Sequence, residues 1–315
     1  MPAVNFDTSR CGIVNDAAYD GLGRRLATAS SDKVVRIWSA DQGNVLAELK
    51  GHRSSVVTLS WASGRFASLL VSGGDDGQVV VWQEARAQDW QPAHQINVTG
   101  AANVVAFCPS EHGLMIAVAG SDDLGIITTL SRREASGGGA PGGNQPWQVR
   151  SFPAHQGGVS SLSWAPSKTA ATMATGPAVG RAVAVAPCRL ASCGADGVVS
   201  IWHCEVRAVE WRKQHELTAD TFNGLPRDVA WRPNIGLPCS QVAACTDEGS
   251  VAVWVQDMDG QPWRLQSCWN VSGDARRLTW SRSGCLLAVS IGDSSSCVFR
   301  EGTAGAWEKV SSLDQ

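Results

Sequence analysis

The chain has 315 residues, of which 43% are hydrophobic and 17% are charged, a composition that excludes a disordered chain and supports a packed core. Its formal net charge of −3 gives no electrostatic footprint for nucleic acid. No apolar run approaches the roughly 18 residues that a transmembrane helix needs. The start, "MPAVNFDTSRCGIVND", lacks the pattern of a signal peptide. We therefore expect any membrane association to be indirect, through partners.

Along the chain, six segments repeat one pattern. Each contains short β-rich runs separated by Gly, Asp, Asn and Ser, and helical periodicity is absent. The segments are 13–50, 51–99, 100–153, 154–218, 219–271 and 272–313. Most of them are close to the ~40–45 residues of a four-stranded propeller blade. Gly/Pro-rich residues 131–146 and Ala/Thr/Gly-rich residues 167–188 read as loop insertions in the third and fourth segments.

Aromatic residues mark the same places in successive segments. The first row is Tyr19, Trp61, Phe107, Trp164, Trp231 and Trp280. The second row is Trp38, Trp82, Trp202, Trp254 and Phe299, with Thr129 in the third segment. A third row is Trp90, Trp147, Trp211, Trp263 and Trp307, which leaves only Trp269 outside the rows. The sequence therefore predicts a single all-β domain over residues 1–315, a six-bladed WD-repeat β-propeller.

The turn between two strands of each segment carries a recurring polar motif. In three segments a hydroxyl, an Asp and a Trp are spaced by four and then six residues: Thr28, Asp32 and Trp38; Ser72, Asp76 and Trp82; Ser192, Asp196 and Trp202. His52 and His155 each precede one of these motifs and can bridge Asp to Ser. A catalytic triad occurs once, whereas this set recurs. We therefore interpret it as a structural strut and expect no enzymatic activity.

The other three segments keep the spacing and lose the hydroxyl. They carry Ala119, Asp123 and Thr129; Ala244, Glu248 and Trp254; Val289, Asp293 and Phe299. These blades must depend more on packing. The ten cysteines show no metal-ligand spacing, and the six histidines are scattered, so we predict neither a metal site nor a cofactor.

Strand counting indicates an open propeller. The sixth segment has its own fourth strand, "AWEKVSS", which leaves the N-terminal run "AVNFD" unused. Exposed strand edges and blade faces are normally covered, so we expect a partner to add β-structure there. Candidate contact residues are Val4, Phe6, Trp307 and Val310, which could instead pack within their own blades. Phe6→Asp is predicted to weaken the partner complex while the blades stay folded.

Several stretches resemble the secretory-thirteen family, the small WD-repeat propeller of the COPII outer coat and of the Y-shaped nuclear-pore scaffold. They are "RRLATASSDKVVRIW", "FCPSEHGLMIAVAGSDD", "RDVAWRPNIGLPCS" and "LTWSRSGCLLAVSIGD", and the resemblance covers nearly the whole chain. It implies an open propeller completed by a seventh blade from an elongated α-solenoid coat or nucleoporin protein. The pair would form edge elements of the vesicle coat in ER-to-Golgi transport, of the pore outer ring, or of both, without enzymatic activity or cofactor.

The resemblance also implies a location. It places the chain at the cytoplasmic face of ER exit sites and COPII vesicles, and at the nuclear envelope within pore complexes. Two other classes stay open on the residues alone. One is a closed WD-repeat propeller that recognises peptides or histone tails across its top face. The other is a propeller hydrolase or metal enzyme, which would need a unique cluster of ligating or catalytic groups.

Overall fold

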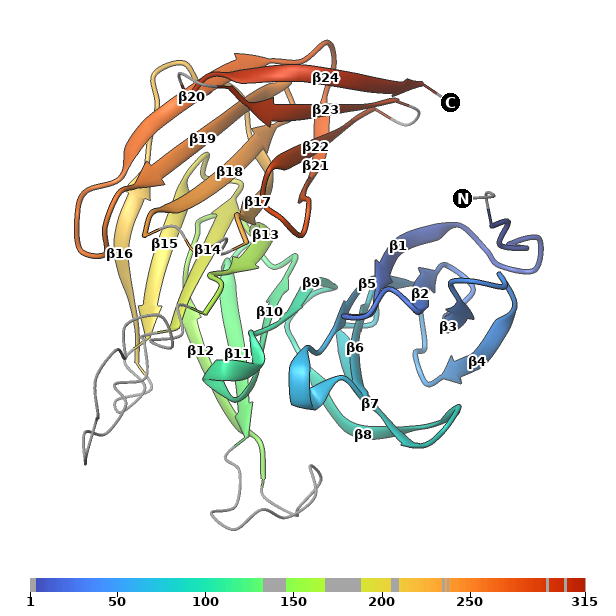
Figure 1. The fold of residues 1–315 in the computed structure, drawn as a ribbon. Coiled ribbons are helices and arrows are strands. Elements are labelled where there is room, and N and C mark those ends of the chain that lie inside the picture. Colours follow the sequence, from blue (N-terminus) through green and yellow to red (C-terminus); the bar gives the residue numbers. More distant parts are fainter. Residues whose placement is uncertain are drawn as a thin grey trace, which may run out of the picture. The chain divides into compact units, whose positions relative to one another are not determined.

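The structure is a computed structural model that describes residues 4–132, 146–167, 188–204, 210–233, 236, 238–292, 295–302 and 305–314. In these ranges the chain forms six four-stranded antiparallel sheets, here called sheets 1 to 6 in chain order. Two compact units divide them, Met1–Ala154 with sheets 1 to 3 and His155–Gln315 with sheets 4 to 6. Figure 1 labels the strands.

The first unit contains twelve strands and two short 3-10 turns. Sheet 1 is β1 (Val14–Tyr19), β2 (Arg25–Ser30), β3 (Val34–Ser39) and β4 (Val45–Lys50). Sheet 2 is β5 (Val56–Trp61), β6 (Leu69–Gly74), β7 (Gln78–Arg86) and β8 (Asp89–Asn97). Sheet 3 is β9 (Ala102–Phe107), β10 (Leu114–Gly120), β11 (Ile126–Arg132) and β12 (Gln148–Pro153). The 3-10 turns are η1 (Gly64–Phe66) and η2 (Ser110–His112).

The second unit repeats the arrangement. Sheet 4 is β13 (Val159–Trp164), β14 (Cys188–Gly194), β15 (Val199–Cys204) and β16 (Trp211–Leu217). Sheet 5 is β17 (Pro226–Trp231), β18 (Ser240–Thr246), β19 (Ser250–Gln256) and β20 (Arg264–Asn270). Sheet 6 is β21 (Ala275–Trp280), β22 (Leu286–Ile291), β23 (Ser295–Glu301) and β24 (Trp307–Asp314). No helix in the described ranges is long and apolar enough to cross a membrane.

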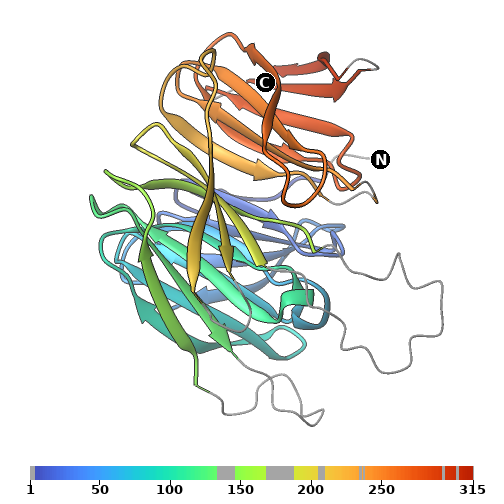
Figure 2. The ribbon, with the colours of Figure 1, turned by 90° about the vertical axis from the view of Figure 1, so that its left-hand side faces the viewer.

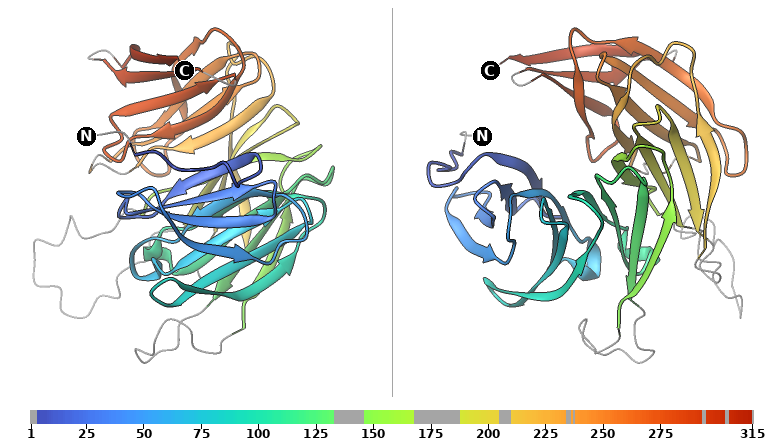
Figure 3. Two further views of the ribbon diagram at one scale, coloured as in Figure 1. Left: turned by 90° about the vertical axis from the view of Figure 1, so that its right-hand side faces the viewer. Right: turned by 180° about the vertical axis from the view of Figure 1, so that it is seen from behind.

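The second strand of each sheet shows why these sequences fold as stacked sheets. Every residue of β6, β14 and β18 is buried, so both faces of the strand are covered. Separate apolar clusters lie between sheets 1 and 2, 2 and 3, 4 and 5, and 5 and 6. The further views of each unit in Figures 2 and 3 show successive sheets packed face to face. Tight turns between strands use glycine at positive φ, as at Gly77 (φ 70°).

The all-β class with six WD-repeat propeller blades is confirmed. Each sheet consists of four strands that are consecutive in the chain. The expected last strand is β24, paired with β23, and residues 4–13 form no strand. Sheets 1 to 5 each lie inside one of the segments expected from the sequence, and sheet 6 extends one residue beyond the expected 272–313, to Asp314. The grouping of all six into one domain stays a prediction, and the two insertions fall almost entirely outside the described residues.

The register of sheet 3 differs from the sequence expectation. The connection between β10 and β11 spans residues 120–126, two residues longer than the equivalent 74–78 in sheet 2. As a result, Leu130 occupies the place that Trp82 has in sheet 2, and Val118 occupies the place of Ser72. Leu130 is fully buried and pairs with Ile116. The expected equivalents Thr129 and Ala119 are each one residue away from that place.

Candidate functional site

The strut of sheet 2 assembles as a chain of hydrogen bonds. Ser72 Oγ on β6 accepts a bond of 2.8 Å from Trp82 Nε1 on β7 and lies 2.7 Å from His52 Nε2. His52 Nδ1 lies 3.4 Å from Asp76 Oδ1 in the β6–β7 turn. Asp76 also accepts the backbone N–H groups of Arg53 and Gln78 at 2.7 and 3.0 Å. The four side chains named in the sequence motif are thus brought together.

Burial and hydrogen bonding set the protonation states of this chain. Burial lowers the pKa of His52, and the neighbouring Asp76 carboxylate offsets this only in part. Burial disfavours ionised Asp76, yet the two backbone N–H groups and His52 outweigh it, so the pKa of Asp76 is lowered. A neutral His52 then donates from Nδ1 to the carboxylate and accepts the Ser72 hydroxyl proton at Nε2.

Sheet 4 contains the same strut. Ser192 Oγ accepts from Trp202 Nε1 at 2.7 Å and lies 2.7 Å from His155 Nε2, while His155 Nδ1 lies 2.9 Å from Asp196. The end of the second strand must be glycine for the imidazole to approach. A Cβ on Gly194 would lie 2.5 Å from His155 Cγ. The corresponding Gly74 of sheet 2 shows the same constraint, with His52 Nδ1 at 2.7 Å.

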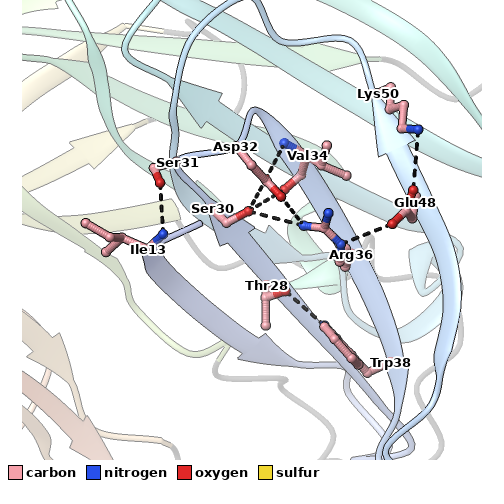
Figure 4. Close-up of polar contacts among 10 residues, drawn as sticks. All are labelled: Ile13, Thr28, Ser30, Ser31, Asp32, Val34, Arg36, Trp38, Glu48 and Lys50. Atoms are coloured by element: carbon pink, nitrogen blue, oxygen red, sulfur yellow. Dashed lines mark hydrogen bonds and ion pairs between the residues drawn. The ribbon is translucent and has the colours of Figure 1, made fainter. Parts of the chain in front are cut away.

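Sheet 1 builds a different network on the same positions, shown in Figure 4. Trp38 Nε1 donates to Thr28 Oγ1 at 2.9 Å, as the motif predicts. Asp32, however, contacts Ser30 and forms an ion pair of 2.7 Å with Arg36, which also reaches Glu48 at 3.2 Å. Arg36 therefore joins Asp32 to Glu48, whereas the histidine of sheets 2 and 4 joins the Asp to the serine that holds the Trp.

Sheets 5 and 6 replace the strut by aromatic packing. Trp254 Nε1 donates to the Thr218 carbonyl at 3.3 Å, and Phe222 packs edge-on against the Trp254 ring at 5.2 Å. In sheet 6, Phe299 contacts Trp269 of sheet 5 at 5.1 Å, and Trp269 stacks on Trp307 at 6.1 Å. Trp269, the tryptophan outside the three rows, thus fills space left by the smaller Phe299. Asp293 lies outside the described residues.

The geometry of the Ser-His-Asp sets favours a structural role. Both serines are fully buried, and a tryptophan N–H already occupies an acceptor site on each hydroxyl oxygen. A substrate has no access to such an oxygen, and a nucleophile needs that access. Across the described ranges no three His, Cys, Asp or Glu residues gather where they could hold a metal ion.

A second recurring contact joins neighbouring sheets within each unit. The hydroxyl–Asp–Trp spacing in the sequence does not predict it. The guanidinium carbons of Arg25, Arg189 and Arg232 lie 4.8, 5.1 and 5.4 Å from the rings of Trp61, Trp231 and Trp280. In each case the arginine belongs to one sheet and the tryptophan to the first strand of the next. Each arginine also bonds Glu84, Gln256 or Glu301, the residue two positions after the second-row aromatic. The acid or amide at this fixed position is the sequence signal that could have indicated the contact.

The partner-contact candidates divide into two pairs. Val4 and Val310 are 37% and 53% exposed. Phe6 packs edge-on against Trp38 with ring centres 6.0 Å apart, and Trp307 is only 9% exposed, between Trp269 and Trp280. Phe6 and Trp307 thus make contacts within the chain, and the partner-contact role of all four residues stays a prediction.

Comparison with known proteins places this architecture in a family. The model of the WD domain, G-beta repeat, matches residues 4–39, 43–83 and 146–203. The chain is 34% identical over 308 residues to "Protein SEC13 homolog" of Drosophila melanogaster, covering 97% of this chain and 82% of that protein. It is 32% identical over 319 residues to "Protein transport protein sec13" of Aspergillus clavatus, covering 96% and 100%. With six four-stranded sheets and relatives matched over nearly their whole length, the chain belongs to the Sec13 family of WD-repeat proteins.

Proposed function

We propose that the chain is a non-catalytic scaffold subunit in protein transport. It pairs with an elongated α-solenoid protein and forms edge elements of the COPII vesicle coat in ER-to-Golgi transport, of the outer ring of the nuclear pore, or of both. Its place is the cytoplasmic face of ER exit sites and COPII vesicles, and the nuclear envelope at pore complexes. It meets membranes only through its partners. Family membership and the "protein transport" names of the relatives support this proposal.

The observation that carries the partner role is the topology of the sheets. Each sheet is made of four consecutive strands, so no strand from one end of the fold is shared with a sheet at the other end. Propeller faces without such a tie are normally covered or paired. A strand-donating partner, which completes the fold as a seventh blade, supplies that cover.

The distribution of exposed apolar side chains supports the same role. Among the described residues thirteen large hydrophobic side chains are exposed, and six of them lie within the first 45 residues. These six are Val4, Ile13, Val14, Tyr19, Leu22 and Val45. Four of them, Ile13, Val14, Tyr19 and Leu22, lie on β1 or next to its ends, and this grouping supports a protein contact along that strand.

The proposal is tested by capturing the tagged chain from its own cells at low salt and identifying stoichiometric partners. Recovery of a long helical solenoid protein with inner-coat proteins supports the coat role, and recovery with solenoid nucleoporins supports the pore role. Histones or one short peptide-bearing client without a solenoid would overturn the proposal and favour a closed recognition module. A chain recovered alone would overturn it as well.

A surface variant sharpens that capture experiment. Phe6→Asp is unsuitable, because Phe6 contacts the buried Trp38 and the charge would disturb sheet 1 itself. Val310 is 53% exposed on β24, so Val310→Asp should leave sheet 6 folded and lower partner affinity about tenfold. Leu124→Asp, at a 62% exposed position in the β10–β11 connection, is the matched control and should have no effect. Equal recovery of both variants would remove Val310 from the contact surface.

A further inference from the structure

The aromatic residue at the end of each first strand has the same place in every sheet but not the same exposure. Trp61, Phe107, Trp164 and Trp231 are at most 9% exposed, and Trp280 is half-buried. Tyr19, the equivalent residue on β1, is 56% exposed. The preceding sheet covers this aromatic in sheets 2, 5 and 6, whereas among the described residues Tyr19 is left more than half exposed.

The covered aromatics show what that element provides. A guanidinium from the preceding sheet lies over the ring, at 4.8 Å for Trp61, 5.1 Å for Trp231 and 5.4 Å for Trp280. The same sheet offers a carbonyl acceptor to the indole N–H, Ala18 O for Trp61 at 2.9 Å and Ala230 O for Trp280 at 3.1 Å. A cation over the ring face, together with a polar partner at the ring edge, is thus the chain's own way to cover this position.

The N-terminal run does not fill this role for Tyr19. Phe6 lies against Trp38 on β3, and Val4 and Asn5 lie close to Gly43 in the β3–β4 connection, where a Cβ would meet the Asn5 carbonyl at 2.3 Å. This run therefore contacts β3 and the β3–β4 connection. On and around β1, Ile13, Val14 and Leu22 are 75%, 37% and 70% exposed; Ile13 and Val14 lie at the start of the strand, and Leu22 follows Tyr19 at its end.

We propose that the protein docked on β1 places an arginine over the ring of Tyr19 and apolar side chains against Ile13, Val14 and Leu22. This inference rests on the proposed function, since it gives the chemistry of the partner's contact with sheet 1. Arginine suits the site because its planar guanidinium stacks on an aromatic face. Sheet 1 has Ala40 where the other sheets supply Glu84, Gln256 or Glu301, so the guanidinium is held by the ring without a carboxylate at that position.

Site-specific photocrosslinking tests the contact in the full chain. Tyr19→p-benzoylphenylalanine is expressed in the source cells, irradiated and captured, and the crosslinked peptide is mapped by mass spectrometry. Leu124→p-benzoylphenylalanine is the control at an exposed apolar position in the β10–β11 connection. We expect position 19 alone to crosslink to the stoichiometric partner, within a few residues of an arginine. Crosslinks only within the chain itself, or to a partner segment without arginine, would overturn the inference.

An affinity series measures the stacking itself with the purified partner identified by capture. Trp presents a better ring to a cation than Tyr, and Leu presents none. We therefore expect Tyr19→Trp to bind at least as tightly as the natural chain, Tyr19→Phe to bind similarly and Tyr19→Leu to bind about 3- to 10-fold more weakly. Substituting the crosslinked partner arginine by methionine should abolish the difference between Tyr19 and Tyr19→Leu.

Different results would contradict the proposed function and the arginine contact. If no stoichiometric partner is captured, the proposed function and the docked arginine fall together. If the partner is captured and Tyr19→Leu binds as tightly as the natural chain, only the arginine contact is wrong. Because Tyr19 is more than half exposed, unchanged thermal unfolding of the variants serves as the folding control.

Discussion

Sheets 4 and 5 follow each other in the chain and hold the tryptophan of their third strand by different interactions. In sheet 4 a buried serine and histidine, together with an aspartate in the exposed turn, orient Trp202 through hydrogen bonds. In sheet 5 the serine position is Ala244, and Trp254 is held by Phe222 and the Thr218 carbonyl. Both sheets keep a tryptophan on the third strand, and the polar strut is one of several ways to hold it. A network of this kind stabilises only when all its members are satisfied.

The largest effect should come from Gly194→Ala in sheet 4. The new Cβ would lie 2.5 Å from His155 Cγ and 2.6 Å from the Gly158 carbonyl oxygen, so the imidazole and the backbone must both move. We expect a loss of about 3 kcal/mol in the free energy of unfolding, measured in urea. Gly21→Ala, with no atom within 4 Å of the new Cβ, is the control and should change little. Similar values for both variants would show that the strut does not constrain sheet 4.

A smaller loss is expected from Ser192→Ala. It leaves the buried Trp202 Nε1–H and His155 Nε2 without their hydroxyl partner, at a cost of about 2 kcal/mol. Ser200 is the matched control, because it pairs across the strands with Ser192, is equally buried and has no hydrogen-bond partner for its Oγ. Ser200→Ala should be nearly neutral. If the two substitutions cost the same in urea unfolding, the hydroxyl of Ser192 contributes nothing beyond its volume.

The smallest expected effect is on the pH dependence of the free energy of unfolding, to which the two sheets with a histidine strut contribute. Burial lowers the pKa of His52 and of His155 in the folded chain. When the solution pH falls below the ordinary histidine pKa near 6.5, the unfolded chain therefore binds more protons than the folded chain. Stability is then full above pH ~6.5 and falls as the pH decreases from there toward the lowered values. The carboxylates Asp76 and Asp196 have lowered pKa values, so their contribution is lost only in more acidic solution.

Unfolding in urea at pH 7.5 and pH 5.5 measures this dependence. The double variant His52→Gln, His155→Gln should lose less stability between the two pH values than the natural chain. Some dependence should persist, because burial also lowers the pKa of His94 and of His215. Identical pH dependence in the variant and the natural chain would assign the effect to groups outside the struts.

The struts could be predicted from the sequence because their geometry is local. Ser192, Asp196 and Trp202 lie on one hairpin, where the spacing of four and then six residues brings them together once the strands pair. The register of sheet 3 could not be predicted in the same way. Its longer β10–β11 connection moves the equivalent of the aromatic to Leu130, and the extra residues give no signal of which position shifts.

The contacts between sheets were the part that the sequence did not reveal. Arg25 and Arg189 lie on the second strands of their sheets, whereas Arg232 follows a first strand. The three arginines therefore share no single position in the repeating segment. The burial of Trp307 depends on Trp269 of the neighbouring sheet. Such packing follows from how whole sheets stack, and a spacing rule within one segment does not contain it.

The four-consecutive-strand construction also determines how the chain can acquire its structure during synthesis. Every hydrogen-bonded ladder joins strands that follow each other directly, from β1–β2 to β23–β24. Each hairpin can therefore close as soon as its second strand leaves the ribosome, and loop-closure entropy is small wherever the connection is short. A propeller that shares a strand between its two ends must keep one sheet unfinished until translation is complete. Here each blade can be completed in order, which shortens the time that unpaired strand edges are available for aggregation.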